Sequence, residues 1–275
     1  MVPSWVKQSL TININNTFKE SLVKFLAHFI TLVSACISFS ISALADGEIN
    51  KIIGENDLIA VAGDGSNIPF RYRKLIDAFG LMNMGCTATH IGRGYVLTAG
   101  HCFWAGDTPQ IDQSCSDTTI QWGYRQDKAA YLTSQCERII IAQRTDGADF
   151  AIIKVSPIPE AFVLPDLTRH AATGDTVTVF SHPDEEPLKW SQLCGVELSH
   201  HPDVDVHSLA HRCDTNPGSS GATILNALTL KIVAIHDGGY AGELNSPTEP
   251  VKSGMNYGTF LLKSPIYEEL VKLGF

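Results

Sequence analysis

The stretch Gly94-Tyr95-Val96-Leu97-Thr98-Ala99-Gly100-His101-Cys102 joins an apolar run to a turn of small residues, and the turn ends in a histidine beside a cysteine. The apolar, β-branched and aromatic residues at its start favour a short strand over residues 95–99. Glycine lets the backbone turn sharply after that strand. The segment therefore predicts a strand that ends by presenting His101.

Short apolar or alternating stretches of the same kind recur along the chain, separated by Gly, Pro, Asn and Asp. Strands about ten residues apart predict an all-β sandwich or barrel. The further predicted strands are 85–91, 118–123, 138–142, 148–155, 176–181, 192–198, 222–225 and 231–236.

Two features divide and end this β pattern. Pro157, Pro159 and Pro165 mark a linker between two halves, because proline cannot donate to a sheet ladder. We therefore expect two packed antiparallel β-barrels, one over about residues 55–160 and the other over about 166–262. A short C-terminal α-helix is predicted over 265–273, with Ser264 capping its first turn.

Composition narrows the class of protein. The chain has 275 residues, of which 44% are hydrophobic and 18% charged, and this excludes a disordered, collagen-like or coiled-coil polymer. The formal net charge is -9. An acidic chain offers no basic surface to a nucleic-acid backbone, so nucleic acid is not an expected partner.

The N-terminus has the pattern of a secretory signal peptide. Lysines precede an apolar run over residues 25–45, which ends in Ala43-Leu44-Ala45. Cleavage after Ala45 would leave residues 46–275 as a secreted or periplasmic protein without membrane attachment. The alternatives are an uncleaved membrane anchor and lipidation at Cys36.

The cysteine count fits export. The chain has seven cysteines, and Cys36 leaves with the signal peptide. An even set in an exported protein indicates disulfides, although the sequence does not select their connectivity. Pairing of sequence neighbours is the simplest arrangement. A zinc site is disfavoured because no Cys-x-x-Cys pair exists. The remaining cysteines are Cys86, Cys102, Cys115, Cys136, Cys194 and Cys213.

Two more segments carry reactive side chains. Asp146 and Gly147 precede the predicted strand 148–155, and Asp149 is its second residue. Asp149 enters the strand, whereas Asp146 beside Gly147 is more typical of a turn. Residues 213–222 read Cys-Asp-Thr-Asn-Pro-Gly-Ser-Ser-Gly-Ala.

Together the three segments resemble the chymotrypsin-like serine proteases. Histidine, aspartate and serine occur in the chain order of that family. The resemblance implies that His101 is the catalytic base, that Asp149 orients it, and that Ser220 is the nucleophile. It also implies an oxyanion hole made by the N–H groups of Gly218 and Ser220, and a disulfide between Cys86 and Cys102 behind the histidine.

The sequence departs from the animal trypsin-like enzymes before the nucleophile. Ser219 stands where those enzymes carry the acid that pairs with the new N-terminus. Lys51-Ile52-Ile53-Gly54 resembles an activation site, but without that acid the usual switch cannot operate. The departure is similar to the bacterial V8-like glutamyl endopeptidases, and whether residues 46–51 are a propeptide stays open.

The substrate pocket has two interpretations. His236 and Thr215 match the residues with which the V8-like branch binds a substrate carboxylate, and Gly238 lies in the same segment as His236. Asp214 instead matches the position of the acid that selects Arg or Lys in trypsin. We favour an acidic P1 residue, the residue on the N-terminal side of the cleaved bond, because a histidine and a hydroxyl suit a carboxylate.

The sequence therefore predicts a monomeric, exported serine endopeptidase that acts on proteins or peptides and requires no cofactor or metal. The cluster His200–His207 is expected to be a polar loop or edge strand rather than a metal site. The rival hypothesis is a non-catalytic exported binding protein of the same fold.

Overall fold

The computed structural model describes residues 51–145, 148–197, 208–240, 255–262 and 264–275. The predicted signal peptide, Asp146 and the cluster His200–His207 lie outside these ranges. The description below concerns the unit that begins at Ile49.

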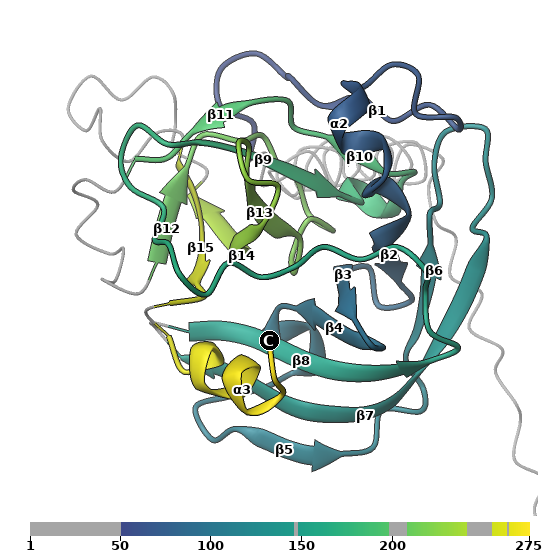
Figure 1. The fold of residues 1–275 in the computed structure, drawn as a ribbon, viewed down its shortest axis with the longest axis vertical. Coiled ribbons are helices and arrows are strands. Elements are labelled where there is room, and N and C mark those ends of the chain that lie inside the picture. Colours follow the sequence, from purple (N-terminus) through teal and green to yellow (C-terminus); the bar gives the residue numbers. More distant parts are fainter. Residues whose placement is uncertain (1–50, 146–147, 198–207, 241–254, 263) are drawn as a thin grey trace, which may run out of the picture. The chain divides into compact units, whose positions relative to one another are not determined.

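The first half of this unit forms a closed antiparallel barrel of six strands (Figure 1). The strand order is β7-β6-β2-β3-β4-β8, and β7 pairs with β8 to close the ring. A short strand, β5, adds to the outside edge of β7. The bounds are β2 Phe79–Met82, β3 Thr87–Gly92, β4 Tyr95–Thr98, β5 Gln110–Gln113, β6 Thr119–Trp122, β7 Leu132–Thr145 and β8 Ala148–Ser156.

The second half forms another antiparallel sheet that also closes. The main path is β1-β10-β9-β13-β14-β15-β12, and β11 pairs with β9. An antiparallel bridge between Val196 and His211 then joins the end of β11 to β12. The bounds are β1 Ile59–Ala60, β9 Thr176–Ser181, β10 Lys189–Trp190, β11 Cys194–Gly195, β12 Ser208–His211, β13 Thr223–Asn226, β14 Ile232–Tyr240 and β15 Met255–Phe260.

Apolar side chains fill each barrel and the space between the barrels. Trp122 is fully buried in the first barrel, and its indole N–H donates to the Ser134 hydroxyl at 2.8 Å. Between the barrels, the rings of Phe79 and Phe180 stack with centroids 5.0 Å apart. Helix α2 (Phe70–Arg73) contributes Tyr72 to the same cluster. Burying these rings fixes the two barrels against each other.

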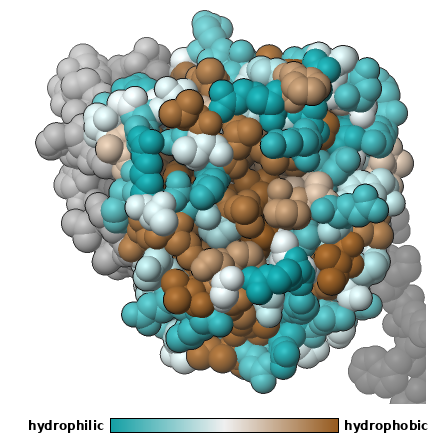
Figure 2. Space-filling view, viewed as in Figure 1, coloured by the Kyte–Doolittle hydropathy of each residue, from teal (hydrophilic) through white to brown (hydrophobic). Residues whose placement is uncertain are grey.

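The chain passes from β8 to β9 through the predicted proline-containing linker. This segment exposes large apolar side chains, with Ile158 52%, Phe162 49% and Leu164 47% exposed. Hydrophobic side chains gather across the middle of the face drawn in Figure 2, between the two sheets of Figure 1.

The C-terminal helix is confirmed, but its predicted cap is wrong. Helix α3 spans Ile266–Lys272 and has no side-chain cap. The Ser264 hydroxyl instead donates to the Phe260 carbonyl at 2.6 Å, and the Ser264 carbonyl accepts the N–H of Tyr267 at 3.2 Å. The short link from β15 brings the Phe260 carbonyl close enough to compete for this hydroxyl.

The predicted all-β fold with two barrels and a short final helix is confirmed. The described residues contain three disulfides, which join Cys86 to Cys102, Cys115 to Cys136, and Cys194 to Cys213. This is the pairing of sequence neighbours, and structural disulfides are typical of an oxidising compartment. The described helices are all too short to cross a membrane as an apolar span.

Candidate active site

His101 lies on the short 3-10 helix Gly100–Phe103 that follows strand β4. Gly100 permits this turn, since a Cβ there would lie 2.0 Å from the Gln143 carbonyl oxygen on β7. The disulfide between Cys102 and Cys86 ties the same turn to the start of β3. Backbone packing and a covalent bond therefore fix the position of His101.

Asp149 holds His101 through both carboxylate oxygens. The imidazole Nδ1 lies 2.7 Å from Oδ2, and the His101 backbone N–H donates to Oδ1 at 2.9 Å. Because an ionised carboxylate only accepts, the proton of the neutral ring lies on Nδ1. The other ring nitrogen, Nε2, is then free to accept a proton.

The backbone of Ser220 is anchored against the first barrel. Its carbonyl accepts the N–H of Thr87 at 2.8 Å. A Cβ at the next residue, Gly221, would lie 2.8 Å from the Ala99 nitrogen, two residues before His101. Ser220 thus lies beside the strand end that carries His101, but no hydrogen bond joins its hydroxyl to His101 in the described part of the chain.

The loop before Ser220 exposes two backbone donors. Gly218 has a φ of +95°, and a Cβ there would lie 2.5 Å from the His182 carbonyl oxygen, so the position requires glycine. The Ser219 N–H donates to the Asn216 carbonyl at 2.9 Å, whereas those of Gly218 and Ser220 have no acceptor among the described residues. Unpaired N–H groups on either side of Ser219 are what an oxyanion hole needs.

Ser219 is not available as a nucleophile in this arrangement. Its side chain is fully buried, and its hydroxyl lies 3.0 Å from the Ser181 hydroxyl. The same oxygen accepts the Asn216 N–H at 3.3 Å.

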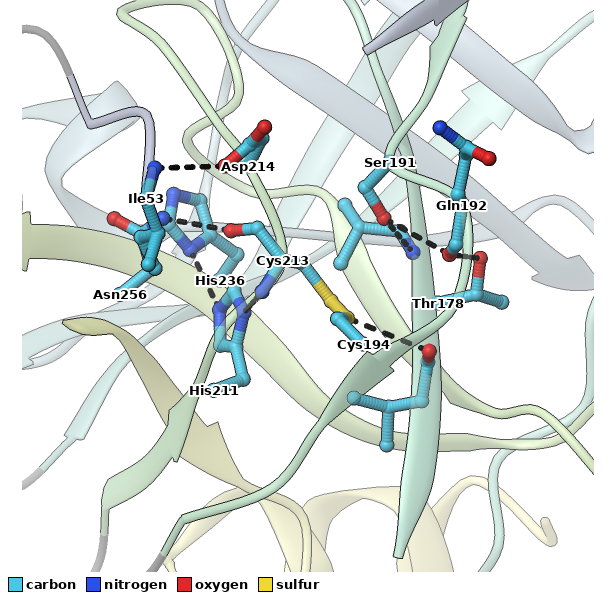
Figure 3. The surroundings of a disulfide bond; sticks show 12 residues. Ile53, Thr178, Ser191, Gln192, Cys194, His211, Cys213, Asp214, His236 and Asn256 are labelled. Atoms are coloured by element: carbon cyan, nitrogen blue, oxygen red, sulfur yellow. Dashed lines mark hydrogen bonds between the residues drawn. A yellow bond between two sulfur atoms is a disulfide. The ribbon is translucent and has the colours of Figure 1, made fainter. Parts of the chain in front are cut away.

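The predicted pocket histidine ends a chain of hydrogen bonds (Figure 3). The Cys213 N–H donates to Nδ1 of His211 at 3.2 Å, and Nε2 of His211 lies 3.2 Å from Nδ1 of His236. Burial lowers the pKa of His211 to about 3 and the pKa of His236 well below its usual value, so both rings are neutral. In a neutral chain that starts at an N–H donor, each Nδ1 accepts, and the final proton lies on Nε2 of His236.

Four buried side-chain atoms at this site form no hydrogen bond with the described residues. They are Nε2 of His236 and Oδ1 of the adjacent Asp237, and the Thr215 hydroxyl oxygen and Oδ1 of the adjacent Asn216. A buried donor without a partner is costly, and it marks a place where a ligand atom can bind.

The Asp214 carboxylate is bound by the backbone of residues 53–57. It accepts the N–H of Ile53 at 2.8 Å and the N–H of Asp57 at 2.6 Å, and Figure 3 shows it directed at Ile53. Burial raises its pKa. The segment that resembles an activation site is therefore attached, through Asp214, to the loop that carries Ser220.

Gly238 lies on β14 opposite Tyr257 of β15. A Cβ at Gly238 would lie 2.3 Å from ring atoms of Tyr257, so glycine lets this ring cover the strand.

Sequence reasoning missed several polar residues around the site. The Thr259 hydroxyl accepts the Asp149 N–H at 2.8 Å and donates to the Asp237 carboxylate at 2.7 Å. Burial raises the pKa of Asp237 well above its usual value, and the nearby Asp149 adds to this effect. Asp237 follows His236 directly, but nothing in its local sequence signals a buried carboxyl group.

Two histidines of the site also lie near cysteine sulfurs, but the arrangement does not favour metal binding. These groups are Cys86, His101 and Cys102, and Cys194, His211 and Cys213. All four sulfurs form disulfides and so cannot act as thiolate ligands.

The comparison with protein families gives the class of protein. Residues 86–235 match the trypsin-like peptidase domain, and the chain belongs to this family of serine endopeptidases.

The solved structures that are similar to this chain include proteases of low sequence identity. A glutamyl endopeptidase in complex with MPD has a TM-score of 0.53 and 17% identity, over 81% of this chain and 98% of its own. The inactive form of the Rv3671c protease has a TM-score of 0.49 and 15% identity, over 74% of this chain and 92% of its own. No curated protein matches the chain in sequence.

Proposed function

We propose that the chain is an exported endopeptidase that cleaves peptide bonds after acidic residues through His101, Asp149 and Ser220. The observation that supports the catalytic roles is the pair of contacts between Asp149 and His101. The neighbouring loop adds two N–H groups that have no acceptor among the described residues. The P1 preference rests on the unpartnered atoms of His236 and Thr215.

The reaction follows from these positions. The Ser220 Oγ attacks the carbonyl carbon while Nε2 of His101 takes the hydroxyl proton, and Asp149 stabilises the imidazolium that forms. The N–H groups of Gly218 and Ser220 bind the oxyanion.

His101 then returns its proton to the leaving amine, which departs as the acyl-enzyme forms. Water attacks the ester carbonyl with His101 again as base, and the acid product is released with a restored Ser220 hydroxyl.

The geometry of Asp214 weighs against the alternative preference for Arg or Lys. A carboxylate that accepts two backbone N–H groups at 2.8 and 2.6 Å is engaged in the fold and is less able to meet a substrate cation. Export is supported by the three disulfides and by the signal-like N-terminus. We expect a monomer that acts on proteins or peptides.

Mass spectrometry of an unfolded protein substrate after digestion tests the proposal. We expect new C-termini at Glu, and no cleavage by the Ser220→Ala variant. Cleavage mainly after Arg or Lys would replace the acidic preference by the alternative. An inert wild-type protein would favour a binding protein of the same fold.

A further inference from the structure

Lys51 lies against the predicted substrate pocket, although its sequence neighbourhood indicated only an activation site. It forms an antiparallel bridge with Thr215, the predicted pocket hydroxyl. The Asn256 side-chain amide donates to the Lys51 carbonyl at 2.9 Å and to the Cys213 carbonyl at 2.7 Å. The backbone of Lys51 is therefore fixed beside the loop that leads to Ser220.

The side chain of Lys51 runs over strand β14. A Cβ at Gly239 would lie 3.0 Å from Cδ of Lys51, so the aliphatic stem passes directly over this glycine. Its ammonium interacts electrostatically with Asp237 and His236, the residues just before Gly238 on the strand. The ammonium therefore lies close enough to His236 and Asp237 to interact with both.

The charge of Lys51 is not neutralised by a close contact. Lys51 forms no ion pair with a carboxylate in the part of the chain that the structure describes, and its side chain is half-buried. Burial lowers its pKa, and the more distant Asp237 only partly offsets this effect. A partly dehydrated ammonium without a close partner favours an incoming anion.

We propose that Lys51 is a specificity-determining residue whose ammonium binds the carboxylate of an acidic P1 residue, together with the Nε2–H of His236 and the Thr215 hydroxyl. This inference rests on the proposed endopeptidase function and adds a charged group to that pocket. His236 and Thr215 alone are neutral and distinguish Glu from Gln only weakly, whereas a cation provides a charge-assisted contact. The same cation disfavours Arg and Lys at P1.

The test measures kcat/KM of the secreted protein on three matched peptide anilides that end in Glu, Gln or Arg. Lys51→Met should reduce kcat/KM for the Glu peptide about 10- to 100-fold, the range expected when a charged hydrogen bond is lost. Its rate on the Gln peptide should stay within about threefold of wild type, since only the charge contact is removed. Lys51→Arg should retain the Glu preference, and Lys128→Met, at an exposed site on the first barrel, should behave as wild type.

The outcomes separate this inference from the proposed function. A wild-type protein that cleaves Gln and Glu peptides equally would overturn the acidic preference, and the role of Lys51 with it. A wild type that prefers Glu, with Lys51→Met keeping that preference, would overturn only the role of Lys51. Equal loss on both peptides would overturn the specificity role and show that Lys51 is needed for the structure of the site. A secreted protein whose intact mass shows that it begins at Ile52 lacks Lys51, and this result would also overturn the role of Lys51.

Discussion

At the scale of single residues, the contact between Asp149 and His101 sets the protonation of the site. The carboxylate accepts from both Nδ1 and the backbone N–H of His101, and so fixes the ring and leaves Nε2 unprotonated. An amide at position 149 can present its own N–H to Nδ1 and favour the wrong tautomer.

Asp149→Asn should therefore lower kcat at neutral pH about 10⁴-fold with a small change in KM. Steady-state kinetics on a Glu peptide anilide measure both constants. Urea unfolding of the variant serves as the control for folding. A loss smaller than about tenfold would show that Asp149 does not orient the catalytic base.

The glycine at position 218 offers a second test at this scale. Gly218→Ala adds a Cβ that would lie 2.5 Å from the His182 carbonyl oxygen, at a φ of +95°. The loop must shift to relieve this contact, which displaces the Gly218 N–H. Losing one oxyanion donor typically lowers kcat about 10²- to 10³-fold.

Gly174→Ala is the matched control for Gly218→Ala. Gly174 has a φ of +88°, but a Cβ there would meet nothing within 4 Å. The Gly174→Ala variant should lose stability through backbone strain alone and keep full activity. Equal activity losses in the two variants would contradict the oxyanion role of Gly218.

At the scale of elements, the segment after Lys51 is attached, through Asp214, to the loop that carries Ser220. Asp214→Asn leaves one of the N–H groups of Ile53 and Asp57 without an acceptor, and should lower the free energy of unfolding by about 1–3 kcal/mol. The ratio of cleavage after Glu to cleavage after Arg should not change. Urea unfolding and the two peptide anilides measure these effects, with the exposed Asp117→Asn as control. A strong change in that ratio would make Asp214 a specificity residue instead.

Most elements could be predicted where the apolar pattern is local. Strand β9 agrees with the predicted 176–181, and β8 ends one residue beyond the predicted 148–155. Strand β7 is much longer than the predicted 138–142, because exposed polar residues alternate with buried ones along Leu132–Thr145. Strand β11 is only two residues long within the predicted 192–198, since its pairing with β9 is that short. Strand β15 was missed because Asn256, Gly258 and Thr259 give it a polar sequence.

Site residues, too, could be predicted from the sequence only where their pattern is local. The three segments around His101, Asp149 and Ser220 were found because each has a distinctive local pattern. Thr259 and Asn256 were missed because their roles depend on distant contacts. Thr259 meets Asp149 across 110 positions of the chain, and Asn256 meets Lys51 across 205. Such pairs arise only when the barrels close.

At the scale of the whole molecule, buried histidines couple stability to pH. Burial lowers the pKa of His182 to about 4 and that of His211 to about 3. The unfolded chain binds these protons below its ordinary histidine pKa of about 6.5, whereas the folded chain does not. The stabilisation is therefore complete above that pH and is lost as the pH falls towards the folded values.

Each of these two histidines should lower the free energy of unfolding by about 2 kcal/mol when the pH falls from 8 to 5. Asp214 and Asp237, whose pKa values are raised, act in the opposite direction over part of this range. Urea unfolding of His182→Gln is compared with that of the parent protein, so that the contribution of the carboxylates to the pH dependence cancels. Both proteins should carry Ser220→Ala to prevent autolysis. The variant should show a smaller pH dependence, and an unchanged slope would contradict a neutral buried His182.

In the proposed function, three distant segments of the chain form one reactive centre at Ser220. Mass spectrometry after treatment with a fluorophosphonate tests it directly, because this reagent reacts with an activated serine. We expect one adduct, on Ser220, that is lost in His101→Ala. An active Ser220 that depends on His101 would be contradicted by an unlabelled wild type, by an adduct on Ser219, or by labelling of Ser220 that persists without His101.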